Sequence, residues 1–424
     1  MTVNELNFAV QRTIDRIIFL RITEDRGLEP YGLQRNLGSQ KETYTQLCRQ
    51  FLEADNRYNS GLFHFNTEKG RMGIPDEFTV NLTIDDKIVQ NILSNLYYPD
   101  SPYEFSVLPT DILGQVYEQF LGKVIQLTKG GQAKVEDKPE VKKAGGVYYT
   151  PTYIVDYIVE QTVGKLLENK IPKEVSGIRI CDPACGSGSF LLGAYQYLLD
   201  WHRDFYIDDD PEKWAKAVGR RRQTLYQEDR GEWRLTTQEK RRILLNNIYG
   251  VDIDSQSVEV TKLSLLLKVL EGENEVTLGH QLVFFQERAL PDLDANIKCG
   301  NSLIGPDFYS QHGKQSVIFA NDEIFRINAF DWNTEFSGIM ENGGFDVVIG
   351  NPPYLRIQGL QEFHANQINY FLNNFQSAIK RFDLYLLFLE KGYSLLRKDG
   401  VTIPSPVEKV QSRQYLAPYH QASW

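Results

Sequence analysis

The chain has 424 residues, of which 42% are hydrophobic and 24% charged, a balance typical of soluble globular proteins with two or three domains. The formal net charge of −10 argues against nucleic-acid binding by the whole surface, although it leaves room for a local basic groove. No apolar run reaches the roughly 18 residues that span a bilayer and no secretory signal is recognisable, so we expect a cytoplasmic protein without a membrane partner.

The first part of the chain is predicted to be helical. Apolar residues recur at three- and four-residue spacings over residues 5–27, 84–98 and 112–127, which is the pattern of an amphipathic helix. We therefore assign residues 1–127 to a mainly helical domain. Residues 128–146 are rich in glycine and lysine and hold almost no apolar side chains, so they are predicted to form an exposed linker.

Beyond the linker the pattern changes to short apolar strands that alternate with helices. Strands are predicted over residues 177–182, 247–254, 297–301 and 345–351, and helices over 151–167, 189–199, 257–272 and 382–396. This rhythm predicts an α/β domain over residues 147–400 with a Rossmann-like, doubly wound, mostly parallel sheet. Residues 201–242 are predicted as a charged insertion of helix plus hairpin, and residues 401–424, with three prolines, as an irregular tail.

The segment 181–190, "CDPACGSGSF", lies between a predicted strand and a predicted helix. Gly186 and Gly188 let the backbone approach a ligand closely, and ligands of open α/β sheets bind at the carboxyl ends of strands. A dinucleotide site would need a third glycine where Leu191 stands, and the Gly-Lys-Ser/Thr of a phosphate loop is absent. The acid at the strand tip, Asp182, instead favours a ligand with a cationic ammonium or sulfonium group.

A second acid ends the next predicted strand. Asp252 stands where a carboxylate accepts hydrogen bonds from ribose hydroxyls, and Ile253 is placed to pack on an adenine ring. Together with the glycine turn, these residues point to S-adenosylmethionine as the cofactor. The alternative is a generic glycine turn with two solvent-facing acids.

The strand predicted over residues 345–351 stops abruptly at Asn351, Pro352, Pro353 and Tyr354. Two prolines cannot continue a strand, because they lack the N–H group and fix φ. The Asn351 side-chain oxygen and the Pro352 carbonyl oxygen could both accept hydrogens from one aromatic NH2 group, which would free its lone pair to attack a sulfonium methyl group. Tyr354 offers a face on which a base could stack. The alternative is a strand-terminating loop in which Tyr354 only packs.

Such a transfer needs positioning and charge stabilisation but no covalent enzyme intermediate, so we expect no catalytic cysteine. The four cysteines form no paired CxxC pattern, and we predict neither a disulfide framework nor a metal site. Cys181 and Cys185, which flank the end of a strand, are interpreted as small buried residues.

In this order, the motifs resemble those of the adenine-specific DNA methyltransferases of the gamma class, whose cofactor motifs precede the catalytic one. The resemblance implies the fold of the methyltransferases that depend on S-adenosylmethionine, and methyl transfer to the 6-amino group of an adenine flipped out of double-stranded DNA. It assigns catalysis to Asn351, Pro352, Pro353 and Tyr354. The cofactor-binding residues that it implies are Tyr149, Thr150 and Pro151; Asp182, Ala184, Gly186, Gly188 and Phe190; Asp252 and Ile253; Asn301, in place of the commoner Asp, and Ser302; and Phe382 and Asp383.

Residues 9–28 resemble the helical connector of Type IIG restriction–modification enzymes, which join a nuclease, a methyltransferase and a recognition domain. The resemblance covers most of residues 1–400. From it we expect a chain truncated at both ends, because it begins at the connector and because the last strands and the recognition domain do not follow residue 400. A separate chain could then supply the recognition domain.

Two other functions stay open at this point. Protein glutamine methyltransferases that act on translation factors share the NPPY motif, although the helical N-terminal region and the charged insertion favour DNA. The chain could also be a catalytically silent remnant that serves as a DNA-binding or assembly subunit.

Overall fold

The computed structural model describes most of the chain, apart from internal stretches and the C-terminal tail. The described residues are 2–39, 41–58, 61–66, 75–107, 122–128, 132–137, 150–217, 223–228, 231–273, 290–311, 327–355, 365–379 and 382–404. They fall into two compact units, which comprise residues 1–138, 203–245 and 259–295, and residues 139–202, 246–258 and 296–424. Both units are discontinuous in sequence, and the domain borders expected from the sequence stay predictions.

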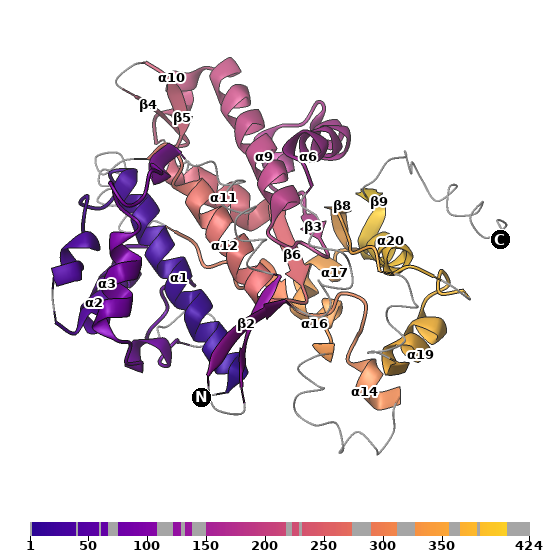
Figure 1. Ribbon diagram of the computed structural model, residues 1–424. Coiled ribbons are helices and arrows are strands. Elements are labelled where there is room, and N and C mark those ends of the chain that lie inside the picture. The colour runs from indigo at the N-terminus through magenta and orange to yellow at the C-terminus, as the bar shows by residue number, and fades with distance from the viewer. Residues whose placement is uncertain are drawn as a thin grey trace. The chain divides into compact units, whose positions relative to one another are not determined.

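The first unit contains the N-terminal helices (Figure 1). These are α1 (Val3–Asp25), α2 (Thr43–Tyr58) and α3 (Asp86–Ser94), with the 3-10 helices η1 (Arg35–Ser39), η2 (Thr79–Asn81) and η3 (Phe105–Val107). A capping box starts α1, because the Thr2 side chain accepts a hydrogen bond from the Glu5 N–H and the Glu5 carboxylate accepts one from the Thr2 N–H.

The helices predicted over residues 5–27 and 84–98 are confirmed. The sequence prediction omits α2, although its buried apolar residues keep helical spacing at positions 47, 51, 54 and 58. Polar residues between them dilute this pattern, so the helix becomes evident only from what it packs against.

Two strands correct the predicted helix over 112–127 and the predicted linker over 128–146. β1 (Lys123–Leu127) and β2 (Ala133–Asp137) pair antiparallel, with Lys123 opposite Asp137. The side chain of Asn7 in α1 both donates to the Ile125 carbonyl oxygen and accepts from the Ile125 N–H, each at 2.9 Å. The apolar spacing of the segment "KVIQL" fits a helix and a strand equally well. It forms a strand because it pairs with β2. Residues 108–121, the body of that predicted helix, lie outside the described part.

The predicted insertion over residues 201–242 does contain helix plus hairpin. It holds α10 (Pro211–Trp214), the antiparallel strands β4 (Leu225–Gln227) and β5 (Trp233–Leu235), and the start of α11 (Thr237–Asn247). The helix predicted over 257–272 is α12 (Ser255–Val269).

The second unit is built on a five-stranded parallel sheet, which confirms the predicted Rossmann-like, doubly wound α/β fold. Its strands are β3 (Ile180–Asp182), β6 (Ile248–Asp252), β7 (Ile297–Cys299), β8 (Phe345–Gly350) and β9 (Leu396–Pro404), in the spatial order β7-β6-β3-β8-β9. The chain lays β6 and β7 on one side of β3 and then returns to lay β8 and β9 on the other. The reversal of order therefore falls between β3 and β8, where ligands of such sheets bind.

The final strand corrects the tail predicted over residues 401–424. Val401, Thr402, Ile403 and Pro404 belong to β9 and pair with β8, whereas residues 405–424 lie outside the described part. β9 pairs along one side of β8, so the irregular tail predicted from residue 401 is wrong for residues 401–404.

Helices cover both faces of this sheet. They are α6 (Thr152–Val159), continued by the π-helix η4 (Glu160–Gly164) and α7 (Lys165–Leu167); α8 (Pro172–Val175); α9 (Ser189–Asp208); α14 (Asp307–Gln311); α16 (Trp332–Glu335); α17 (Ser337–Met340); α19 (Ala365–Asn374); and α20 (Leu384–Leu395). On one face, Cys181, Val251 and Val348 pack with Trp332 and Phe336.

On the other face α9 packs against the sheet and α6 packs against α9. A Cβ atom at Gly250 would lie 2.7 Å from Cδ1 of Leu191, and one at Gly193 would lie 2.5 Å from Cγ1 of Val155. Only glycine fits these contacts without a shift of the neighbouring side chain. None of the helices in the described part of the chain is long and apolar enough to cross a bilayer.

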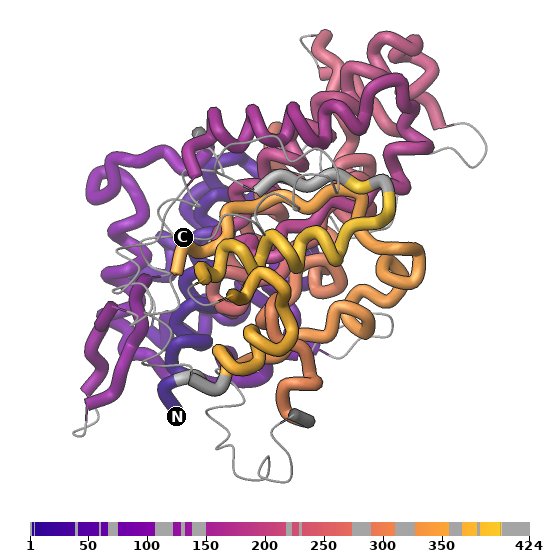
Figure 2. The backbone as a smooth tube through the Cα atoms, turned by 90° about the vertical axis from the view of Figure 1, so that its right-hand side faces the viewer, coloured from indigo at the N-terminus to yellow at the C-terminus, as the bar shows by residue number. Residues whose placement is uncertain are grey.

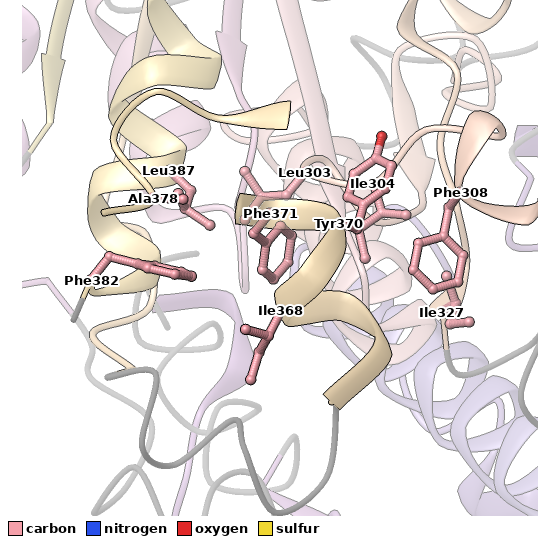
Figure 3. Packing of buried hydrophobic residues seen from close by; sticks show 10 residues of the cluster. All are labelled: Leu303, Ile304, Phe308, Ile327, Ile368, Tyr370, Phe371, Ala378, Phe382 and Leu387. Carbon is pink, nitrogen blue, oxygen red and sulfur yellow. The ribbon is translucent and has the colours of Figure 1, made fainter. Parts of the chain in front are cut away.

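A second apolar cluster joins α19 and α20 to the segment after β7 (Figure 3). α19 and α20 lie side by side in both backbone views (Figure 1, Figure 2). Phe371 of α19 meets Phe382 edge to face at 6.4 Å between ring centroids, and Leu303 and Ile304 belong to the same cluster. This packing fixes the start of α20, which bears on the site below.

The first unit encloses a charged residue, Arg16, that is 1% exposed. Its guanidinium group donates to the Leu62 carbonyl oxygen, the Thr79 hydroxyl and the Asp76 carboxylate at 2.8, 2.6 and 2.8 Å, and it lies 4.5 Å from the centre of the Phe65 ring. Burial by itself would raise the pKa of Asp76, but the charge of Arg16 and the hydrogen bonds from Thr79 outweigh it and hold that pKa below its usual value.

We expect R16M to destabilise the protein by about 3–5 kcal/mol, because it leaves the buried Asp76 carboxylate without its counter-charge. The free energy of unfolding in urea measures this. R49M is the control, since Arg49 is exposed on α2, and it should cost less than about 0.5 kcal/mol. Equal stability of the two variants would contradict the role assigned to Arg16.

Candidate active site

The carboxyl ends of three neighbouring strands bring the predicted motifs to one edge of the sheet. Asp182 ends β3, Asp252 ends β6, and Asn351 follows directly after β8. The strands pair in parallel, with Asp182 opposite Gly250 and Cys181 opposite Val348, so β6 and β8 extend one to two residues beyond the end of β3. This is the edge at which an open α/β sheet binds ligands.

The glycine turn after β3 is held by backbone hydrogen bonds to the tip of β6. The Cys185 N–H donates to the Val251 carbonyl oxygen at 3.1 Å, and the Gly186 N–H donates to Oδ2 of Asp252 at 2.9 Å. Gly186 and Gly188 have φ values of +53° and +87°, which side chains rarely tolerate. The turn therefore needs glycine at both positions, and it passes directly into α9.

Asp182 is a buried acid at the centre of this edge. It is 1% exposed, and its Oδ1 accepts a hydrogen bond from the Ala184 N–H at 2.9 Å. Burial raises the pKa of Asp182 to about 8, and the negative charge of Asp252 adds to that rise, whereas the Ala184 hydrogen bond opposes it. The buried Asp182 and the half-buried Asp252 together offer two carboxyl groups to a cationic ligand.

The tip of β8 touches this acid. A Cβ atom at Gly350 would overlap the carboxyl group of Asp182, so only glycine fits directly before Asn351. The turn that holds the two acids and the segment that begins with Asn351 are consequently in direct contact.

In the described part of the chain, the amide nitrogen of Asn351 has a hydrogen-bond partner and its amide oxygen has none. Its Nδ2 donates to Oγ1 of Thr150 at 3.1 Å, and Thr150 is 7% exposed. Its Oδ1 is buried and has no hydrogen-bond partner among the described residues. A buried carbonyl oxygen without a donor costs free energy, and such groups in native proteins call for an explanation such as a missing ligand.

Tyr354 stacks on a second aromatic side chain, Tyr385 in the first turn of α20. The ring centroids are 5.4 Å apart and the planes differ by 15°, while Tyr354 stays 43% exposed. The Leu384 N–H donates to the Leu355 carbonyl oxygen at 3.0 Å, which ties the same loop to α20. Burial, with the neighbouring Tyr385 and Asp383, raises the pKa of Tyr354 to about 12, so its phenol is neutral at physiological pH.

The segment after β7 is fastened to the glycine turn. The Ser302 hydroxyl donates to the Pro183 carbonyl oxygen at 2.5 Å, and the Asn301 N–H donates to the Asn328 carbonyl oxygen at 2.6 Å. Oδ1 of Asn301 accepts the Leu303 N–H at 3.1 Å, so that oxygen serves the local turn. Among the described residues no group of His, Cys, Asp and Glu could hold a metal ion.

With this geometry in place, the comparisons with known proteins become informative. Residues 246–404, which include the tips of β6 and β8, match the family model of the Eco57I restriction-modification methylases. Over 415 aligned residues the chain is 34% identical to the Type II restriction enzyme and methyltransferase RM.Eco57I of Escherichia coli, an alignment that covers 97% of this chain and 37% of that protein.

Two further relatives align over most of the chain. RM.MjaORFECS2P of Methanocaldococcus jannaschii is 27% identical over 362 residues, which are 69% of this chain and 27% of that protein. The adenine-specific methyltransferase BrxX of Escherichia coli is 24% identical over 450 residues, which cover 84% of this chain and 33% of that protein. The chain thus spans between 27% and 37% of the length of these three relatives.

Most of the predicted site residues lie at or beside these strand tips. Ala184, Gly186, Gly188, Asp182, Asp252, Thr150 and Asn351 meet at the strand tips described above, and Ile253 beside them is 51% exposed. Pro352 is buried and Pro353 exposed. Pro151 is the N-cap residue of α6, Phe190 is buried in α9, and Tyr149 lies outside the described residues.

Phe382 and Asp383 stabilise the start of α20, by packing and by capping respectively. Phe382 is 3% exposed within the second apolar cluster, and the Asp383 carboxylate caps α20 by accepting from the Tyr385 N–H at 3.1 Å. The sequence reasoning missed two residues of the site, Gly350 and Tyr385. Each stood beside a motif already recognised, Gly350 directly before Asn351 and Tyr385 two residues after Asp383.

The raised pKa of Asp182 predicts a pH effect on stability. The folded state keeps the Asp182 proton up to about pH 8, whereas the unfolded chain loses it near pH 3.8. The contribution of Asp182 is therefore fully present below the unfolded pKa and is lost as pH rises toward 8, at up to about 1.4 kcal/mol per pH unit. We expect D182N to unfold in urea with a weaker decline of stability between pH 5 and 8 than the unmodified protein. Parallel pH profiles for the two proteins would contradict the burial of this acid.

Proposed function

We propose that this protein is a DNA methyltransferase of a restriction–modification system, which transfers a methyl group from S-adenosylmethionine to the 6-amino group of adenine. The observation that carries the proposal is the buried Oδ1 of Asn351, which has no hydrogen-bond partner in the described part of the chain and lies next to the acids and glycines of the strand tips. The 6-amino group of adenine could donate the hydrogen bond that this oxygen lacks. Accepting its hydrogens would draw the nitrogen lone pair away from the ring and ready it for attack.

The residues at the strand tips suit the cofactor. Asp182 and Asp252 offer carboxyl groups to the cationic and ribose parts, and the positive-φ glycines let the turn approach closely. When bound, S-adenosylmethionine supplies the electrophilic methyl group. The protein positions the amine with Asn351 and Pro352, and catalysis comes from orientation and charge rather than from a covalent intermediate.

Adenine in a duplex is reached only when the base leaves the stack, so the substrate is double-stranded DNA with a flipped adenine. Tyr354 supports this assignment, because its exposed ring is held by Tyr385 on one side and could accept a base on the other. The names of two relatives, a Type II restriction enzyme and methyltransferase and an adenine-specific methyltransferase, point to the same reaction. We also propose a cytoplasmic location, where cellular DNA is accessible.

The direct test is incubation of the protein with radiolabelled S-adenosylmethionine and genomic DNA free of N6-methyladenine. We expect label in DNA as N6-methyladenine. N351A should abolish it, because the amine loses its acceptor, whereas N342A, which replaces an exposed asparagine, should retain it.

Two other outcomes identify the remaining alternatives. Label in a glutamine-containing peptide and none in DNA would establish a protein glutamine methyltransferase instead. Calorimetry that finds no binding of S-adenosylmethionine at millimolar concentration would establish a catalytically silent remnant.

Substitution of Tyr354 tests the stacking role. Y354A should lower the rate of DNA methylation about 10- to 100-fold, because base–aromatic stacking contributes roughly 1–3 kcal/mol, and Y354F should keep most of the rate. The binding constant for S-adenosylmethionine, measured by calorimetry, should change in neither variant. A loss of rate in Y354F as large as in Y354A would show that the phenol group, rather than the ring, is what matters.

A further inference from the structure

We infer that Thr150 is a positioning residue that sets the direction of the Asn351 amide, rather than a residue that binds the cofactor. This inference deepens the proposed function and rests on it. It departs from the family resemblance, which places Thr150 among the cofactor contacts.

The contact joins two distant parts of the sequence within the second unit. Thr150 and Asn351 are 201 positions apart, and their side chains meet at 3.1 Å between Oγ1 and Nδ2. The contact is partly buried, since Thr150 is 7% exposed and Asn351 is half-buried. A hydrogen bond in such surroundings is stronger than one in water, and its loss leaves a partly buried donor unsatisfied.

The direction of the amide decides whether the site can work. With Nδ2 held by Thr150, the only acceptor of the side chain, Oδ1, is left for a ligand. Rotation of the amide by half a turn would instead present two N–H donors to an NH2 group, which is itself a donor. The orientation in the structure is therefore the productive one for an amine substrate.

Thr150 is itself firmly placed. It precedes Pro151, whose carbonyl oxygen accepts the first backbone hydrogen bonds of α6 from Ile154 and Val155. Val155 packs against Gly193 of α9, and α9 starts at the glycine turn. The Thr150 hydroxyl is thus attached to the same framework that carries the two acids.

The test uses the full chain with T150V, which keeps the side-chain shape and removes the hydroxyl, and T150S, which restores it. We expect T150V to lower the single-turnover rate of DNA methylation about 10- to 100-fold and to change the binding constant for S-adenosylmethionine less than twofold. T150S should recover most of the rate. A fall in cofactor affinity as large as the fall in rate would overturn the inference in favour of a cofactor contact.

A second measurement does not depend on activity. T150V should lower the melting temperature by about 2–4 °C in the unmodified protein but not in N351A, because that amide is the hydrogen-bond partner of the hydroxyl within the described residues. Equal losses in both backgrounds would overturn the inference. If the unmodified protein methylates no DNA at all, the proposed function fails, while this cycle still decides whether the contact exists.

Discussion

The parallel pairing of β3 with β8 is the constraint on which the candidate site depends. Cys181 lies opposite Val348. Asp182 therefore leaves β3 at the same edge of the sheet at which Gly350 and Asn351 leave β8. No space remains for a side chain on Gly350 beside the carboxyl group of Asp182. The fold thereby places an acidic ligand-binding turn and an amide–proline corner in contact, although more than 160 positions separate them in sequence.

Ionisation of both acids at these neighbouring strand tips is unfavourable in the unliganded protein, so Asp182 keeps its proton there up to about pH 8. Asp182 is fully buried, and its pKa is raised by burial and by the charge of Asp252. Backbone N–H groups of Ala184 and Gly186 offset part of this cost. A cationic ligand would offset the rest, so the proposed sulfonium cofactor gives a reason for an arrangement that folding alone would disfavour.

The support around the loop after β8 is aromatic and apolar rather than charged. Tyr385 lies under Tyr354, and α20, which carries Tyr385, is held by Phe382 and Leu387 in the second apolar cluster. Rigid packing around the loop limits the freedom of Tyr354 and of Asn351. A site that acts by orientation needs such support, because small displacements of the reacting groups reduce the rate strongly.

The sequence by itself determined four of the five sheet strands of the second unit, the glycine turn and the NPPY corner, because their signals are local: apolar runs, glycines, prolines and acids at fixed offsets. The sequence-based prediction failed at Lys123–Leu127, where the apolar spacing fits a helix and a strand equally well. It also failed at residues 401–404, which form a strand by pairing with β8, about 50 positions earlier in the chain. Only the tertiary structure decided that Gly350 must lack a side chain, that Tyr385 backs Tyr354, and that Thr150 holds one end of the Asn351 amide. These are contacts between side chains that come together through strand order and helix packing, and no spacing along a single chain encodes which atoms will meet.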